Sequence, residues 1–288
     1  MVLYTNIFTQ ICITLVAVAG VYVLTGLTGM FSLGQAAFMA VGAYVSGIFV
    51  VKLGLPFPVA CIGAVVIAVG IGFIVGIPTV RLRKDYISLV TLGFGEAITA
   101  LLNRTTKLTG GASGFIGIPK KTTALLAFTS AVVAILLVNW FKKSKYGRQC
   151  VAIRGDELAA KAMGINVARI KITAFLLSVA FTAFSGCLYA FYITYVDPSI
   201  FGWKKSADWV IMVFFGGVNS LTGSILGATI LSALPEVLRG LANYRSIIYA
   251  ILVLLIINFK PSGIMGEYEL PDLFKRRKGR TKLQKEEN

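Results

Sequence analysis

Apolar segments of about 17–25 residues recur along this chain, and an α-helix needs that length to cross the hydrocarbon core of a bilayer. Only 14% of the residues are charged, whereas a soluble domain carries about 25%. The chain is therefore expected to form one domain over residues 1–288, an all-α polytopic transmembrane helical bundle with about 8–10 membrane-spanning helices, some of them short or broken. The expected spans are 7–27, 36–51, 59–78, 86–103, 123–141, 172–195, 209–215, 224–238 and 246–259.

Two glycine-rich interruptions divide these apolar segments, at 29–34 (GMFSLG) and 217–223 (GVNSLTG). Each places Ser-Leu between two glycines, which indicates either an internal repeat of the kind that transporters use or a chance similarity. Backbone groups freed at such breaks must face protein or water. Ser32, Gln35 and Ser220 are therefore candidates to line a translocation pathway, with close helix packing as the alternative.

The basic residues indicate which loops are cytoplasmic. Placing 80–85, 142–171 and 260–288 on one side of the membrane collects 19 of the 28 Lys and Arg residues there, as the positive-inside rule requires. The N-terminus is then outside, and the basic tail at 264–288 is cytoplasmic. The net charge of +16 is explained by this topology and by contact with anionic lipid, so we predict no nucleic-acid partner.

The longest polar segment, 150–171, is predicted to contain a short helix with both ends specified. Asp156 can cap its first turn, Glu157 lies at its positive end, and Gly164 supplies a left-handed stop. Asn166 can then cap the next helix. Because so short a helix is unstable alone, it needs a surface to lie on. We predict that it docks into a partner protein, the alternative being a passive cytoplasmic loop.

Glu96 lies at the centre of the span at 86–103, where a carboxylate is costly unless it faces a polar cavity or a partner. It is either a pathway group near the amino group of a zwitterionic substrate or a packing hydrogen bond between helices. The glycine-rich loop at 109–119 lacks the Gly-Lys-Ser/Thr sequence of a phosphate loop, and we predict it to be an external docking surface.

The sequence lacks the residues that several kinds of chemistry require. The chain has no His, and its four cysteines show no paired or metal-ligand spacing. It contains no Walker A sequence and no nucleophile–base set. We therefore predict no catalytic residues, no metal site and no cofactor, and a transporter subunit rather than an enzyme. The N-terminal residues do not read as a removable signal peptide.

Several blocks of this sequence occur together and in one order. They are 27–43 (LTGMFSLGQAAFMAVGA), 81–96 (RLRKDYISLVTLGFGE), 108–119 (LTGGASGFIGIP), 146–170 (YGRQCVAIRGDELAAKAMGINVARI), 215–228 (FGGVNSLTGSILGA) and 259–263 (FKPSG). In these blocks the chain resembles the permeases of branched-chain amino-acid ABC importers, of the LivM type. The resemblance covers nearly the whole chain, although the chain looks short at its N-terminus by comparison with many members.

The resemblance implies a bacterial inner-membrane importer that is driven by ATP. Its partners would be two ATP-binding cassette subunits, a second permease that is a LivH-type paralogue, and an extracytoplasmic substrate-binding protein. The segment 142–171 would be the cytoplasmic coupling loop that rests in a groove of the cassette. The loop residues carried over are Arg154, Asp156, Glu157, Ala160, Gly164 and Ile165. Its movement is expected to tilt the two flanking spans and so switch access.

Two alternatives for the function remain open at this point. Permeases of the same family also carry urea, short amides or other amino acids, and the sequence does not select among these substrates. An ion-coupled secondary transporter is a second alternative, although such proteins usually have several ionisable groups at the membrane midplane. Here the sequence offers one clear candidate, Glu96.

Overall fold

We analysed a computed structural model of the chain, in which the described residues are 2–82, 84–237, 250–251, 254, 258–260, 262–266 and 269. The fold is all-α apart from one two-stranded pairing. The first half contains α1 (Val2–Tyr22), the π-helix η1 (Val23–Leu27), α2 (Gln35–Val51), α3 (Phe57–Thr79), α4 (Lys84–Arg104), α5 (Thr106–Thr109), the 3-10 helix η2 (Gly111–Ser113) and β1 (Phe115–Ile116). The second half contains α6 (Ala124–Lys143), α7 (Lys145–Gly155), α8 (Glu157–Ala162), α9 (Val167–Ile193), β2 (Tyr195–Val196), the 3-10 helix η3 (Pro198–Phe201), α10 (Trp203–Gly216) and α11 (Leu221–Val237).

The prediction of a polytopic helical membrane protein is confirmed. Five helical segments of the described chain are long and apolar enough to cross a membrane: Tyr4–Leu27, Phe57–Thr79, Tyr86–Arg104, Ala124–Lys143 and Val167–Ile193. Two shorter apolar helices, Gln35–Val51 and Leu221–Pro235, accompany them. The expected last span at 246–259 and the basic tail at 264–288 fall mostly outside the described residues, so the total of 8–10 spans stays a prediction.

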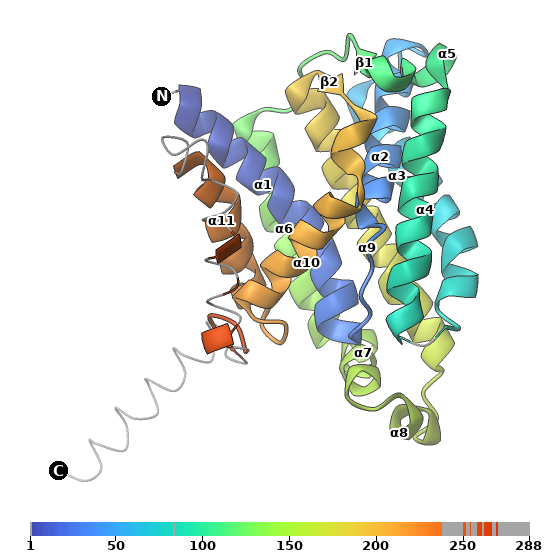
Figure 1. Cartoon of the computed structure of the whole chain (residues 1–288), viewed down its shortest axis with the longest axis vertical. Coiled ribbons are helices and arrows are strands. Elements are labelled where there is room, and N and C mark those ends of the chain that lie inside the picture. The colour runs from blue at the N-terminus through green and yellow to red at the C-terminus, as the bar shows by residue number, and fades with distance from the viewer. Residues whose placement is uncertain are drawn as a thin grey trace, which may run out of the picture.

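The bundle is organised around α1 and α9, which are its most buried long helices (Figure 1). The most hydrophobic part of each is 67% buried inside the chain, whereas the corresponding part of α4 is only 17% buried. Helix α2 crosses α9 closely because Gly42 and Gly186 face the partner backbone. A Cβ atom at Gly42 would overlap the carbonyl oxygen of Ala183, and one at Gly186 would overlap that of Met39. Small residues thus permit the tight contact that packs helices in a membrane.

The ends of the bundle differ in their structure (Figure 1). Helices α7 and α8 project from one end, which we call the α7–α8 end. At the opposite end, β1 pairs with β2 in antiparallel fashion, with Phe115 opposite Val196. The glycine-rich loop at 109–119 lies here, and Gly110 and Gly114 adopt positive φ angles of 78° and 75°. We call this the β1–β2 end.

Helix α10 differs from the sequence prediction. The sequence predicts an apolar stretch at 209–215 after an exterior loop, but the helix already begins at Trp203, and its 14 residues include Lys204, Lys205 and Asp208. Its first turn reaches the interior of the bundle, because the hydroxyl of Ser206 accepts a 2.9 Å hydrogen bond from the backbone N–H of Ala36 at the start of α2. The polar start of α10 was read as loop because charged residues interrupt the apolar pattern.

Candidate coupling site and pathway residues

Helices α7 and α8 are short, and side chains define each of their ends. The Ser144 hydroxyl begins α7 by accepting a 3.2 Å hydrogen bond from the N–H of Gly147. Asp156 ends α7 and begins α8, since its Oδ1 accepts hydrogen bonds from the N–H groups of Leu158 (2.8 Å) and Ala159 (3.1 Å). The predicted Asp156 cap is confirmed, and one residue fixes the angle between the two helices.

The end of α8 also follows the prediction. Gly164 has φ of +80°, and the N–H groups of Gly164 and Ile165 bond to the carbonyls of Lys161 (3.0 Å) and Ala160 (3.1 Å). This pair of bonds is the Schellman arrangement, which favours glycine at the left-handed position. Asn166 then caps α9 by accepting a 3.1 Å hydrogen bond from the N–H of Arg169. A sharp turn therefore joins α8 to a long central helix.

Three of the six predicted coupling residues face the chain itself. Arg154 donates a hydrogen bond from Nη1 to the carbonyl oxygen of Gly26, and Ala160 is buried. Glu157 forms an ion pair with Lys171 on α9, with 2.7 Å between Oε2 and Nζ. Lys171 is only 1% exposed, so Glu157 neutralises a buried cation. These residues hold the element in place and do not form its outer surface.

The outer surface of α8 consists of other residues. Leu158 is 80% exposed and Met163 is 84% exposed, and the backbone of Gly164 lies beside them. Two apolar side chains that project so far into solvent on a short helix indicate a surface that a partner covers. The sequence contains this signal, because both residues are apolar within the longest polar segment of the chain. Cys150 of α7 is no part of this surface, since it is fully buried, and this burial raises the pKa of its thiol to about 12.

The first glycine break is buried and internally hydrogen-bonded. Residues 29–34 are not helical, and Ser32 and Gln35 are 1% and 0% exposed. The Ser32 hydroxyl lies 3.4 Å from the N–H of Gly34, and the Gln35 side-chain carbonyl accepts a 3.2 Å hydrogen bond from Thr182 on α9. In this conformation both predicted pathway residues pack between helices, and their pathway role stays a prediction.

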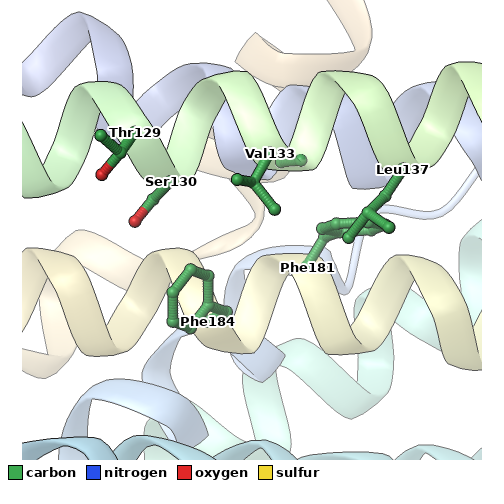
Figure 2. Close-up of a pocket in the computed structure, with 7 residues that line it drawn as sticks. Thr129, Ser130, Val133, Leu137, Phe181 and Phe184 are labelled. Atoms are coloured by element: carbon green, nitrogen blue, oxygen red, sulfur yellow. The ribbon is translucent and has the colours of Figure 1, made fainter.

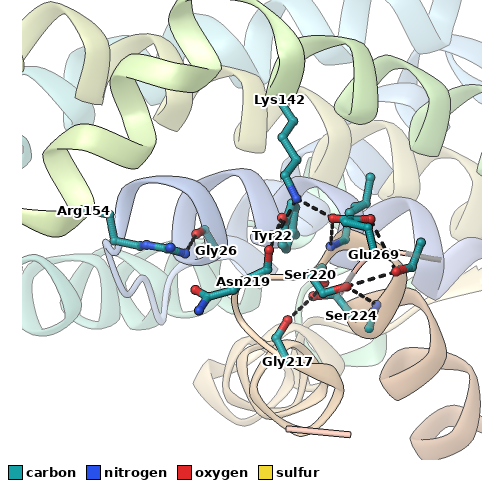
Figure 3. A network of polar contacts seen from close by, with 12 residues as sticks. Tyr22, Gly26, Lys142, Arg154, Gly217, Asn219, Ser220, Ser224 and Glu269 are labelled. Atoms are coloured by element: carbon teal, nitrogen blue, oxygen red, sulfur yellow. Dashed lines mark hydrogen bonds and ion pairs between the residues drawn. The ribbon is translucent and has the colours of Figure 1, made fainter. Parts of the chain in front are cut away.

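The second break lies beside Tyr22 of α1 and Gly26 of η1, as Figure 3 shows. Ser220 is buried, and its hydroxyl accepts a 3.0 Å hydrogen bond from the N–H of Gly223 in the first turn of α11. The carbonyl of Val218 lies 2.9 Å from the position that a Cβ at Gly26 would take. The second break therefore packs against η1, just before the first break, and Gly26 provides the room.

Glu96 lies on the outer face of α4. Its side chain is exposed, whereas the neighbouring Gly95 is buried against the first break, with 3.6 Å between its Cβ position and the Cα of Gly34. Within the described part of the chain, no Lys or Arg lies within ion-pair distance of Glu96. The sequence missed Lys205 and Asp208, which bring further ionisable groups to the start of α10, next to the start of α2.

A shallow pocket lies between α6 and α9 (Figure 2). Val133 and Leu137 line it from α6, and Phe181 and Phe184 line it from α9. The walls are mainly apolar, and Val133 is 53% exposed within a membrane-spanning helix. This pocket suits lipid tails and offers little to a polar substrate. No group of three Cys, Asp or Glu side chains among the described residues could hold a metal ion.

The fold and its projecting element define a class: a polytopic helical membrane protein whose connection between α6 and α9 is built as a rigid element at one end. Comparison with known proteins identifies the family. The family described as "Branched-chain amino acid transport system / permease component" matches residues 3–257. The chain therefore belongs to this family of transport permeases, and the resemblance in the sequence is confirmed.

The relatives include permeases of two types, LivM and LivH. The chain is 32% identical to the high-affinity branched-chain amino acid transport system permease protein LivM of Salmonella typhimurium, and the match covers 90% of this chain and 69% of the relative. The identity and coverage are the same for LivM of Escherichia coli. The LivH permease of Escherichia coli is 24% identical, with 85% of this chain and 88% of the relative covered.

Proposed function

We propose that the chain is the LivM-type permease of an importer that moves branched-chain amino acids inward at the expense of ATP hydrolysed by two separate cassette subunits. The observation that carries the proposal is the α7–α8 element, capped by Asp156 and Gly164, with Leu158 and Met163 exposed. A short rigid helix with an apolar face fits a groove on a soluble subunit. Membership of the permease family makes an ATP-binding cassette the partner that fits.

The proposed docking is tested by charge introduced on the exposed face of α8. Leu158→Asp and Met163→Asp are expected to prevent the cassettes from co-purifying with the permease in mild detergent, because an aspartate would be desolvated at the interface. Leu53→Asp is the matched control, since Leu53 is 63% exposed and the neighbouring Lys52 bonds to the carbonyls of Lys107 and Leu108, beside the glycine-rich loop. Cassettes that still co-purify with both α8 variants would contradict the proposal.

The proposed orientation places the α7–α8 end in the cytoplasm and the β1–β2 end outside. The basic residues of α7 support it, because Lys and Arg concentrate in cytoplasmic loops. The extracytoplasmic binding protein would then meet the β1–β2 end, where Ile116 is 71% exposed beside the glycine-rich loop. Single cysteines at 116 and 158 test the orientation, since a membrane-impermeant thiol reagent should label only position 116 in intact cells.

The second permease is proposed to pack against the outer face of α4. Leu89 is 64% exposed and Leu101 is 60% exposed on this face, and Gly93 has open space around it. Exposed Glu96 is at the middle of the same helix, where contact with lipid tails would be costly. A LivH-type partner suits the site, because the chain's similarity to LivH indicates a shared fold and hence a pseudo-symmetric pair. Glu96 would then face a pathway between the two permeases.

The transport reaction is tested with the assembled importer in proteoliposomes. Radiolabelled leucine, with the binding protein outside and ATP inside, is expected to accumulate only when ATP is hydrolysed. Urea and short amides, supplied in the same way, should not compete with leucine. Accumulation that follows an ion gradient without ATP would refute the ATP-driven proposal and would favour a secondary transporter.

A further inference from the structure

The segment 23–34 leads into the start of α2 and is mostly buried inside the bundle. The π-helix η1 closes α1 with five buried residues, and Gly29 turns the chain with φ of +69°. The nonhelical residues up to 34 then lead to α2, which begins inside the bundle beside Ser206. A π-helix within a regular helix often marks a functional position. Any movement of the turn at 26–29 will therefore displace the first residues of α2.

Arg154 of α7 binds this turn directly (Figure 3). Its Nη1 donates a hydrogen bond to the carbonyl oxygen of Gly26, one of the last carbonyls of the helix, which lack intrahelical partners. Its aliphatic stem covers Gly29, where a Cβ atom would lie 2.8 Å from Cγ of Arg154. Because Arg154 belongs to the last turn of α7, only Gly155 separates it from Asp156, the residue that joins α7 to α8.

A second cation, in the last turn of α6, holds the second break. Lys142, two residues before the Ser144 cap, donates a 3.3 Å hydrogen bond to the carbonyl of Asn219 and pairs with Glu269. Glu269 in turn accepts a 3.0 Å hydrogen bond from the N–H of Leu221 at the start of α11. Lys142, just before α7, thus binds the backbone of the second break, and Arg154, in the last turn of α7, binds the backbone of η1.

We infer that Arg154 is a positioning residue that transmits displacement of α8 through the carbonyl of Gly26 to the start of α2. The inference rests on the proposed function, because it supposes that a cassette moves α8. The inferred route of movement differs from a simple tilting of the flanking helices α6 and α9. The movement passes through α7 into a segment more than 120 residues away in the sequence. The start of α2 packs against α4 and α10, which carry Glu96 and Lys205, so its displacement would alter the proposed pathway.

The test compares two arginines of α7 in the complete importer reconstituted in proteoliposomes. Arg154→Met keeps the apolar stem but removes the bond to Gly26. Arg148→Met is the matched control, because Arg148 also donates to a backbone carbonyl, that of Lys143, at 2.8 Å on the exposed surface. Arg154→Lys is the conservative variant, which keeps the cation and is used alone if Arg154→Met fails to assemble.

The readout is labelling of a cysteine introduced at Leu33, in the segment that should move. The four native cysteines are buried, so a small methanethiosulfonate reagent should report mainly on position 33. ATP is expected to change the labelling rate in the Arg148→Met importer as in the native one. In Arg154→Met that change should disappear, and leucine uptake per ATP hydrolysed should fall by roughly tenfold, the factor that one charge-assisted hydrogen bond is worth. Arg154→Lys should restore part of both.

The outcomes separate this inference from the proposed function. An unchanged ATP response at position 33 and normal uptake per ATP in Arg154→Met would overturn the role of Arg154 while leaving the importer intact. If the importer with native Arg154 fails to bind cassettes or to require ATP, the proposed function itself is wrong, and the inference fails with it. Equal losses in Arg148→Met and Arg154→Met would show a general defect of α7 and would also overturn the inference.

Discussion

Replacing Glu157 with alanine should destabilise the α7–α8 element by leaving a buried cation unpaired. Lys171 is 1% exposed and lies 2.7 Å from the Glu157 carboxylate, whose side chain is 40% exposed. Removing one partner of a buried ion pair costs about 3–5 kcal/mol. Because water reaches Glu157, we expect a loss of stability at the lower end of this range, about 3 kcal/mol. This total includes about 0.5 kcal/mol for the lost interaction of the Glu157 carboxylate with the positive N-terminal end of α8.

A double-mutant cycle measures this cost. Glu157→Ala/Lys171→Met removes the stranded charge and should recover most of the lost stability, since an apolar side chain of similar length fills the same site. The assays are thermal unfolding in nanodiscs and hydrogen exchange of the amides at 157–165. Lys161→Met, an exposed change on the same helix, should shift stability by no more than about 0.5 kcal/mol. If the double variant is no more stable than Glu157→Ala, the reasoning is refuted.

Four further predictions concern other parts of the chain. Asp156→Ala removes two capping bonds and should speed hydrogen exchange in α8 about fivefold, equivalent to about 1 kcal/mol, whereas Asp156→Asn should change it little. Gly42→Val should lower the melting temperature and expression sharply, because a Cβ overlaps the backbone of α9; Gly70→Val, in open space, is the control. Glu96→Gln should slow leucine uptake about tenfold while ATP hydrolysis and assembly persist, and unaltered uptake would exclude it from the pathway. Burial opposes ionisation of Glu269, but hydrogen bonds from Lys142 and Leu221 lower its pKa overall. The stabilising effect of Glu269 should therefore be present above the usual pKa range of glutamate and lost as acid protonates the carboxylate. Glu269→Gln should remove this part of an acid-unfolding profile.

The caps of α8 could be predicted from sequence because they depend on local geometry. Asp156, Gly164 and Asn166 act within three residues of their own positions, and each adopts the predicted role. The long spans could be predicted for a similar reason, since a run of apolar residues has few alternatives in a membrane. Membership of the permease family was likewise carried by the ordered sequence blocks.

The orientation of individual side chains could not be predicted in this way. The sequence predicts Arg154 and Glu157 as members of one coupling loop but does not say what they contact, and the structure pairs them with Gly26 and Lys171. Local sequence patterns do not reveal either of these two partners. The charged start of α10 was misread for a related reason, because Ser206 meets Ala36 only when the bundle is assembled.

The sequence by itself therefore determined the class of protein, the apolar spans, the two breaks and the capped helix, all of which follow from short-range hydrogen bonding and from the length that a bilayer demands. Only the tertiary structure decided which groups meet: that the second break touches η1 at Gly26, that Lys142 binds the second break and Arg154 binds η1, and that Glu96 points away from the bundle. The physical reason is that these contacts join residues far apart in the chain. Their geometry depends on how closely α1, α9 and their neighbours pack, and hence on small side chains whose effect no local pattern expresses.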